Sequence, residues 1–293
     1  DSGADPDKAA SLARNSDVAI VFAYQWESED MDLPTLSLPE HQDGLIAKVA
    51  AANPNTVIVL ETGGPVTMPW AGQVGAILEA WYAGSKGSEA VANVLFGDVN
   101  PSAKLPLTFP RGDADLSHPQ IVKAPRESVP NDRQREVWKQ IAAGLPPFQV
   151  TYDEGVKVGY KWYDAEHKPV LFAFGHGLSY TTYSYSGLKV EPGKAPRVRF
   201  TVKNTGERPG AEVAQIYASL PVGASEPPKR LVGWSKVKLE PGESKEVTVE
   251  VEPKYLSIFN VEQNGWQLVP GEYGFMVGGS SQDLPLKQSV SLK

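Results

Sequence analysis

Val18-Ala-Ile-Val-Phe-Ala-Tyr24 is a short, nearly continuous run of β-branched and aromatic residues that decides the fold class of this chain. A run of this kind, bounded by polar residues, predicts a strand buried on both faces, as in a parallel sheet. Trp26-Glu-Ser-Glu-Asp-Met-Asp32 follows it and brings four carboxylates within six positions. Because ligands of open α/β sheets gather at the carboxyl ends of the strands, these acids lie where a binding or catalytic group is presented.

Helix-like and strand-like segments alternate around this run. The residues from Pro39 onwards predict a helix that ends at Asn53-Pro-Asn55, since proline favours the first turn of a helix and interrupts a later one. The full set of expected elements comprises helices over 7–14, 39–52 and 88–96 and strands over 18–24, 57–60 and 76–82. Short apolar strands that alternate with helices predict an α/β sandwich, a mostly parallel sheet with helices on both sides.

The pattern changes to all-β from about Tyr183. Residues 197–203 and 246–252 alternate polar and apolar side chains with period two, and turn signals such as Asn264-Gly265 and Pro270-Gly271 separate the expected strands. Short strands at this spacing over about 110 residues predict an immunoglobulin-like or fibronectin type III-like sandwich.

Three regions result from these patterns. We expect an α/β sandwich domain over 1–110 that lacks its first strands, a connecting or inserted region over 111–182 that packs on the other domains, and a fibronectin type III-like domain over 183–293. The connecting region holds several prolines and one expected helix over 133–143. A chain of 293 residues also exceeds the usual size of one hydrophobic core, so more than one domain is expected from length alone.

Charge and composition argue against several function classes. The net charge of −7 argues against a nucleic-acid partner, which needs clustered lysine and arginine. No apolar stretch approaches the roughly 20 residues that span a bilayer, so no membrane partner is expected. The lack of cysteine removes disulfides, thiolate metal sites and a cysteine nucleophile, and His41, His118, His167 and His176 do not have metal-ligand spacing. We expect no metal and no cofactor.

The acid cluster that follows Trp26 is open to three interpretations. Its carboxylates can face water in an ordinary loop, or they can bind Ca²⁺, although the glycine and final glutamate of an EF-hand loop are missing. The third interpretation is a general acid/base, because neighbouring carboxylates and an aromatic side chain raise the pKa of a glutamate toward about 6. The residues by themselves leave all three open.

Five motifs stand in order along the chain. They are Trp26-Glu-Ser-Glu29-Asp-Met-Asp32, Asn55-Thr-Val-Ile-Val-Leu-Glu-Thr-Gly-Gly-Pro65, Ala80-Trp-Tyr-Ala-Gly84, Gly97-Asp-Val-Asn-Pro-Ser-Ala-Lys-Leu-Pro106 and Phe174-Gly-His-Gly-Leu-Ser-Tyr180. Together they resemble glycoside hydrolase family 3 of the β-glucosidase type over nearly the whole chain. The resemblance implies the C-terminal part of such an enzyme, an α/β sandwich domain followed by a fibronectin type III-like domain.

The resemblance also implies a reaction and its residues. A retaining glycosidase places a nucleophile and an acid/base carboxyl about 5–5.5 Å apart. The acid/base of the family is the glutamate of a Trp-x-x-Glu-Gly-x-Asp-Arg-like segment, which falls on Glu29 here, and Trp26 is expected to line the sugar pocket. Asp30 and Leu33 stand where glycine and arginine are common, so Glu27 is kept as a rival proton donor.

The nucleophile of the family is an aspartate on a (β/α)₈ barrel, which takes about 250 residues against the roughly 100 of the α/β region here. We therefore expect the C-terminal piece of an exo-acting β-glucosidase or exo-β-glucanase. It would act on β-linked glucosides or oligosaccharides only with the N-terminal barrel docked, in the same or a separate chain, and reside in the periplasm or outside the cell. The alternative is a non-catalytic carbohydrate-binding or adhesion module that rests on the sandwich domain and on Trp26, Trp81, Trp162, Trp234 and Trp266.

Overall fold

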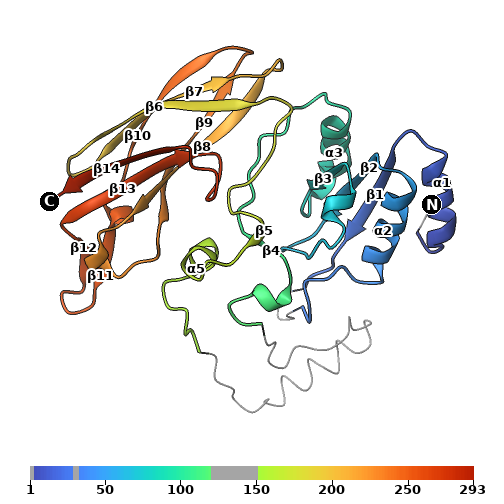
Figure 1. Ribbon diagram of the computed structural model, residues 1–293, viewed down its shortest axis with the longest axis horizontal. Helices are drawn as coiled ribbons and strands as arrows, with labels where there is room; N and C mark the ends of the chain where they lie inside the picture. Colours follow the sequence, from blue (N-terminus) through green and yellow to red (C-terminus); the bar gives the residue numbers. More distant parts are fainter. Residues whose placement is uncertain (1–2, 29–32, 120–150) are drawn as a thin grey trace. The chain divides into compact units, whose positions relative to one another are not determined.

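The computed structural model describes residues 3–28, 33–119 and 151–293. The chain divides into two compact units, an α/β unit of Asp1–Glu89 and Pro110–Asp153 and a β-rich unit of Ala90–Phe109 and Glu154–Lys293. Figure 1 shows the elements of each unit in sequence colours. The domain boundaries inferred from the sequence, 1–110, 111–182 and 183–293, stay predictions.

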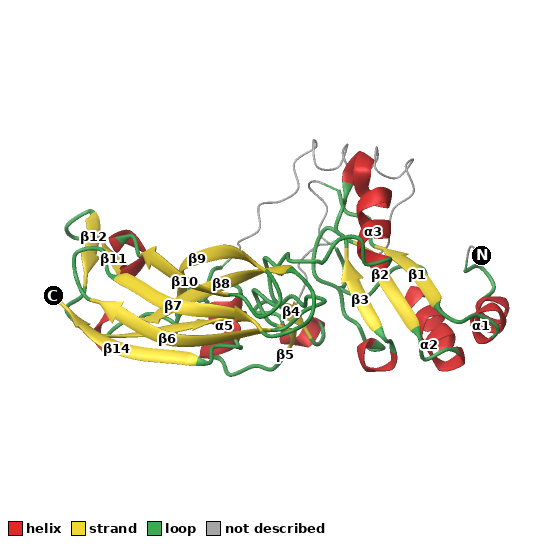
Figure 2. Cartoon of the chain, turned by 90° about the horizontal axis from the view of Figure 1, so that it is seen from above, coloured by secondary structure: helices red, strands yellow, loops and turns green. Residues whose placement is uncertain are grey.

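A three-stranded parallel sheet in the order β1-β2-β3 forms the centre of the α/β unit (Figure 2). In its register Ala19 lies opposite Thr56, and Val57 lies opposite Ala76. The unit contains α1 (Pro6–Arg14), β1 (Ala19–Tyr24), α2 (Gln42–Ala52), β2 (Thr56–Glu61), β3 (Ala76–Glu79) and the short 3-10 helices η1 (Ala71–Gln73), η2 (Gly84–Lys86) and η3 (Asp113–Asp115), and α3 (Gly87–Leu95) begins in it. Parallel strands joined through helices confirm the predicted α/β class.

Side-chain hydrogen bonds set the ends of the helices. The carboxylate of Asp5 accepts hydrogen bonds from the backbone N–H groups of Asp7 and Lys8, each at 3.1 Å, and caps α1. Beyond the end of α2, the buried amide of Asn53 donates to two carbonyl oxygens at and just after the end of α1, at 2.9 and 2.8 Å. One asparagine thus holds the ends of α1 and α2 together.

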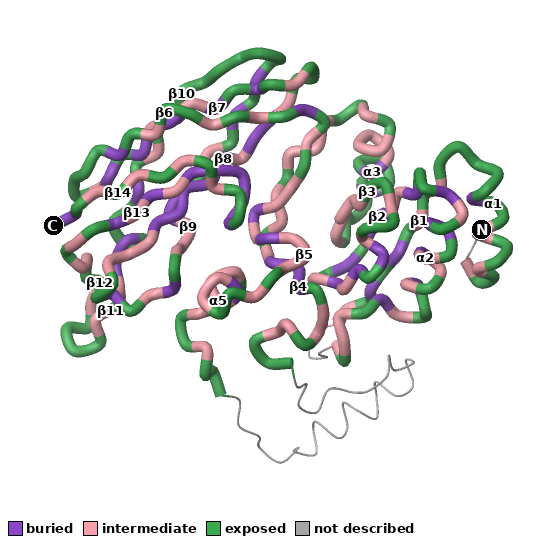
Figure 3. Tube along the Cα trace, viewed as in Figure 1, coloured by how far each residue is buried: buried purple, intermediate pink, exposed green. Residues whose placement is uncertain are grey.

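The side chains of β1 are more exposed than the sequence predicts. In the central strand β2, residues Ile58–Leu60 are fully buried, whereas in β1 Phe22 is 57% exposed and Ile20 and Tyr24 are each 43% exposed. Figure 3 shows the same mixture of buried and exposed positions along this strand. The prediction of a strand buried on both faces is therefore wrong for β1. β1 is an edge strand of the sheet. Its side chains Ile20, Phe22 and Tyr24, which lie at alternate positions along the strand, are exposed.

An antiparallel sandwich forms most of the β-rich unit. Its two sheets have the strand orders β10-β7-β6 and β14-β13-β8-β9. Side chains of both sheets fill one core, in which Phe200 and Phe275 are fully buried. The strands are β6 (Tyr183–Glu191), β7 (Arg197–Asn204), β8 (Gly210–Ser219), β9 (Arg230–Leu239), β10 (Ser244–Glu250), β13 (Gly271–Gly278) and β14 (Leu286–Leu292). This arrangement confirms the predicted fibronectin type III-like sandwich.

Smaller elements complete the β-rich unit. Backbone hydrogen bonds of 2.8 Å join Leu105 to both Gly175 and His176, so the segment before β4 is tied to the segment after β5. These elements are β5 (Val170–Phe172), α5 (Tyr160–Ala165), the hairpin of β11 (Ser257–Asn260) and β12 (Gly265–Leu268), and the 3-10 helices η4 (Val222–Ala224) and η5 (Pro253–Leu256), and β4 (Phe109–Pro110) begins in this unit.

Two element boundaries differ from the sequence prediction for a physical reason. The helix expected from Pro39 begins at Gln42, because Glu40 and His41 have positive φ angles of 56° and 60°. The strand expected over 76–82 ends at Glu79, and Trp81 has a φ of 52°. The helix expected over 133–143 lies outside the described residues. Among the helices that the structure describes, none has the length and apolar character that a bilayer crossing requires.

Candidate active site

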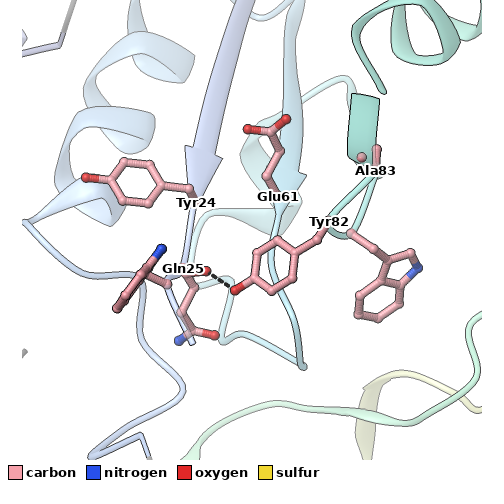
Figure 4. A pocket seen from close by; sticks show the side chains of 8 residues that line it. Tyr24, Gln25, Glu61, Tyr82 and Ala83 are labelled. Carbon is pink, nitrogen blue, oxygen red and sulfur yellow. Dashed lines mark hydrogen bonds between the residues drawn. The ribbon is translucent and has the colours of Figure 1, made fainter. Parts of the chain in front are cut away.

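The carboxyl ends of the three parallel strands lie together at one end of the sheet, and a pocket of about 270 Å³ opens there. Tyr24 and Gln25 enter it from the end of β1, Glu61 from the end of β2, and Tyr82 from the chain after β3 (Figure 4). Trp26 and Trp81 also line it. Aromatic walls with a few polar groups are typical of a site for a small ligand.

Gln25 and Trp26 differ sharply in exposure although they are neighbours. Gln25 is only 3% exposed, and its backbone N–H donates to the carbonyl oxygen of Glu61 at 3.2 Å. The Oε1 atom of Gln25 is buried and has no hydrogen-bond partner among the described residues. Trp26 is 67% exposed and presents its ring at the pocket. Trp26 therefore lines this pocket, and the predicted role of the residue in a sugar site stays a prediction.

The predicted acid/base, Glu29, lies outside the described residues, as do Asp30 and Asp32. Its rival Glu27 is described, and its carboxylate packs against the turn after β2. A Cβ atom on Gly63 would collide with this carboxylate and would lie 2.9 Å from the ring of Tyr82, and one on Gly64 would lie 3.2 Å from Glu27 Oε1. A side chain at either glycine would thus displace the carboxylate of Glu27 from its present position.

Glu79 is a half-buried acid at the end of β3 that none of the sequence patterns singles out. Burial raises its pKa to about 7, against the smaller opposing effect of hydrogen bonds from Trp81 and Thr62. Its Oε1 atom accepts from the backbone N–H of Trp81 at 3.0 Å, and both of its oxygens lie 3.4 Å from the hydroxyl of Thr62. An acid at the end of the apolar run 76–79 was the available signal.

The hydroxyl of Thr62 explains how a neutral Glu79 fits this position. Thr62 donates its one hydroxyl proton to the carbonyl oxygen of Gly64 at 2.8 Å. The lone pairs of the same hydroxyl then remain for a donor, and a protonated carboxyl of Glu79 can supply that hydrogen bond. The result is a chain of hydrogen bonds from Trp81 through Glu79 and Thr62 to the glycine turn that contacts Glu27.

Tyr82 connects the ends of two strands. Its hydroxyl donates to the carbonyl oxygen of Gln25 at 2.5 Å, across 57 positions of sequence, as the dashed line in Figure 4 shows. The residue before it, Trp81, has a φ of 52°, which is uncommon for a residue with a side chain. The backbone turn at Trp81 and the hydroxyl of Tyr82 together link β3 to the segment after β1.

A glutamine side chain completes the edge of β1 near the pocket. The amide of Gln42 accepts from the backbone N–H of Tyr24 and donates to its carbonyl oxygen, both at 2.9 Å. Gln42 thereby imitates one residue of a neighbouring strand. The hydroxyl of Tyr24 donates to Glu40 at 2.8 Å, and this hydrogen bond is the largest of the effects that raise the pKa of Tyr24.

Within residues 3–28, 33–119 and 151–293, no three histidine or acidic side chains form a group that could hold a metal ion.

Comparison with known proteins identifies two family models along the chain. Residues 3–180 match the model of the glycosyl hydrolase family 3 C-terminal domain, and residues 212–281 match that of the fibronectin type III-like domain. Beta-glucosidase B of Emericella nidulans is 39% identical over 98% of this chain and 34% of its own length. Thermostable beta-glucosidase B of Acetivibrio thermocellus is 39% identical over 97% of this chain and 36% of its own length.

Solved structures give the same result. DesR, a beta-glucosidase from Streptomyces venezuelae in complex with D-glucose, superposes with a TM-score of 0.84 and 39% identity, over 98% of this chain and 35% of that one. A family 3 beta-glucosidase from Bifidobacterium adolescentis has a TM-score of 0.84 and 35% identity, over 98% and 40%. The chain thus spans about a third of the length of the curated relatives named here. The chain belongs to glycosyl hydrolase family 3. It corresponds to the C-terminal part of these proteins, including a fibronectin type III-like domain.

Proposed function

We propose that this chain is the C-terminal portion of a retaining, exo-acting β-glycosidase, a β-glucosidase or exo-β-glucanase, and that Glu29 is its general acid/base. One observation carries the proposal: the chain runs on to Glu29 from the pocket at the carboxyl ends of three parallel strands, where Trp26 presents an exposed ring. Relatives at 39% identity that are named beta-glucosidases support the reaction class.

The surroundings of Glu27 favour Glu29 over its rival. A proton donor must reach the glycosidic oxygen of the substrate, so its carboxyl group has to face the substrate. The carboxylate of Glu27 packs against Gly63 and Gly64 instead. Glu27 therefore shapes the turn after β2, and the proton-transfer role falls to Glu29.

The second carboxyl comes from outside this chain. We propose that an aspartate on an N-terminal (β/α)₈ barrel is the nucleophile, in the same polypeptide or in a separate one. The length of the relatives, about three times the matched region, leaves room for a barrel of about 250 residues. The two carboxyl groups would then flank the substrate about 5–5.5 Å apart, the spacing of retaining glycosidases.

Each step of this reaction has a defined proton balance. The aspartate attacks the anomeric carbon and the bond to the leaving oxygen breaks, while Glu29 donates its proton to that oxygen. The same glutamate, now ionised, then takes a proton from the water that hydrolyses the glycosyl-enzyme ester. A β-linked glucoside or oligosaccharide is consumed, and the aspartate and the protonated Glu29 are regenerated.

Glu29→Gln in the complete enzyme tests the role of this residue. We expect kcat/KM to fall about 10²–10⁴-fold with substrates whose leaving groups need protonation, and to change little with dinitrophenyl glucosides, whose leaving groups do not. With dinitrophenyl glucosides kcat should still fall, because hydrolysis of the glycosyl-enzyme loses its general base. Azide should restore turnover with the activated substrate, because it does not require a general base. Glu27→Gln is the matched control and should show no dependence on the leaving group. The reverse result for the two variants would assign the role to Glu27.

We also propose a periplasmic or secreted location, which rests on the class of substrate. A periplasmic or secreted enzyme would meet oligosaccharides that are released from polymers outside the cell. Fractionation of cells that express the complete protein tests this proposal. Activity confined to the cytosolic fraction would contradict it.

A further inference from the structure

The turn that follows β3 contacts the segment after β1 in two places. The hydroxyl of Tyr82 donates to the carbonyl oxygen of Gln25 at 2.5 Å. The ring of Tyr82 and the carboxylate of Glu27 both lie against the position that a side chain on Gly63 would occupy. Tyr82 thus lies beside the chain both before and after Trp26.

We propose that Tyr82 is a positioning residue that holds the segment Gln25–Glu27, from which the sequence continues to Glu29, and that it thereby supports proton transfer to the substrate. This inference rests on the proposed function, because the segment matters for catalysis only if Glu29 is the acid/base. Glu29 follows Gln25 by four positions in the sequence.

The hydrogen bond from Tyr82 holds the chain just after the point at which the pairing of β1 with β2 ends. The paired positions of β1 and β2 end at Tyr24 and Glu61, and the backbone N–H of Gln25 still donates to Glu61. The carbonyl oxygen of Gln25 lies past the last pair and accepts from a side chain instead. A hydrogen bond at this position fixes the direction in which the chain leaves the sheet.

The turn itself is held by Glu79. The left-handed backbone of Trp81 is uncommon for a residue with a side chain and persists where the surroundings favour it. The acceptor for the Trp81 N–H is Oε1 of Glu79, at 3.0 Å. Without that acceptor the backbone conformation of the turn is less stabilised, and the hydroxyl of Tyr82 moves out of hydrogen-bond distance of Gln25.

Tyr82→Phe in the complete enzyme removes the hydroxyl and keeps the ring. We expect kcat/KM to fall about 10-fold with glucosides that have poor leaving groups, since one hydrogen bond is lost, and less than about 2-fold with dinitrophenyl glucoside. Tyr180→Phe is the matched control, because the hydroxyl of Tyr180 also donates to a backbone carbonyl, that of Val94 at 2.7 Å, in the β-rich unit. It should leave both substrates unchanged.

A double variant shows whether Tyr82 acts through Glu29. In a Glu29→Gln background, Tyr82→Phe should have almost no further effect, because the proton donor that it positions is gone. Equal losses with both substrates, no loss at all, or a full further loss in the double variant would overturn the inference. If instead Glu29→Gln itself lacks the leaving-group pattern, the proposed function fails, and the two failures are thereby distinguished.

Glu79 gives a second, independent set of variants. Glu79→Ala removes the acceptor for Trp81 and should reproduce the leaving-group pattern of Tyr82→Phe. Glu79→Gln keeps an oxygen that accepts the same N–H and should retain at least half of the activity with both substrates. A Glu79→Gln enzyme as impaired as Glu79→Ala would contradict the role given to this turn.

Discussion

The two units of this chain bury their large apolar side chains to different degrees. In the β-rich unit, Phe200 in β7 and Phe275 in β13 are fully buried between two sheets that the chain itself supplies. In the α/β unit, β1 presents Phe22 at 57% exposure with Ile20 and Tyr24 at 43%. All three of these exposed side chains lie at alternate positions along one edge strand.

This difference indicates which unit depends on a partner. A contiguous group of large exposed apolar side chains marks an interaction surface more often than a free one. An exposed edge strand also presents unpaired backbone groups. We therefore propose that the remainder of the enzyme covers β1, while the sandwich is stable by itself and serves as a structural brace.

The largest expected effect tests the closed core of the sandwich. Phe200→Ala should lower the free energy of unfolding of the β-rich unit by about 3–5 kcal/mol, because a fully buried aromatic side chain leaves a cavity. Denaturant titration of the 293-residue chain, followed by tyrosine and tryptophan fluorescence, measures it. A change below 1 kcal/mol would show that this core is not closed in solution.

Particular residues show how far the sequence could predict this structure. The β-branched runs 18–24 and 57–60 place two strands correctly, since such side chains fit a pleated sheet. The same runs could not reveal that Phe22 is exposed, because an apolar pattern does not say which chain covers it. The bond between Tyr82 and Gln25 joins residues 57 positions apart, and no local pattern encodes it.

The prediction of intermediate size rests on a comparison of two acids, Glu212 in the β-rich unit and Glu79 in the α/β unit. In the β-rich unit, Glu212 lies 3.1 Å from the ammonium of Lys104 and accepts from the hydroxyl of Tyr185 at 2.7 Å. In the α/β unit, the groups within hydrogen-bond reach of Glu79 are the N–H of Trp81 and the hydroxyl of Thr62, both of them neutral. A half-buried carboxyl whose hydrogen-bond partners are neutral holds its proton more tightly than one beside an ammonium, in agreement with the raised pKa of Glu79.

Glu79 should therefore make the stability of the α/β unit depend on pH. Its pKa is about 7 in the folded chain and 4.5 without the fold, so the folded state binds the proton more tightly. The contribution of about 3 kcal/mol is complete below pH 4.5 and is lost as the pH rises through 7. Unfolding free energies between pH 4 and 8 measure it, with Glu79→Gln as the comparison. Equal slopes for the two chains would contradict the prediction.

The smallest expected effect examines the exposed strand directly. In the 293-residue chain Phe22→Ala should cost less than about 1 kcal/mol, because more than half of its side chain already faces solvent. In the complete enzyme the same change should cost about 2 kcal/mol more, the value of burying one phenylalanine under the remaining part. Phe259→Ala is the matched control, since Phe259 is 47% exposed in the β-rich unit and should cost the same in both proteins. Equal costs for Phe22→Ala in the two proteins would mean that β1 stays uncovered, and the sandwich and the α/β unit would then not differ in their need for a partner.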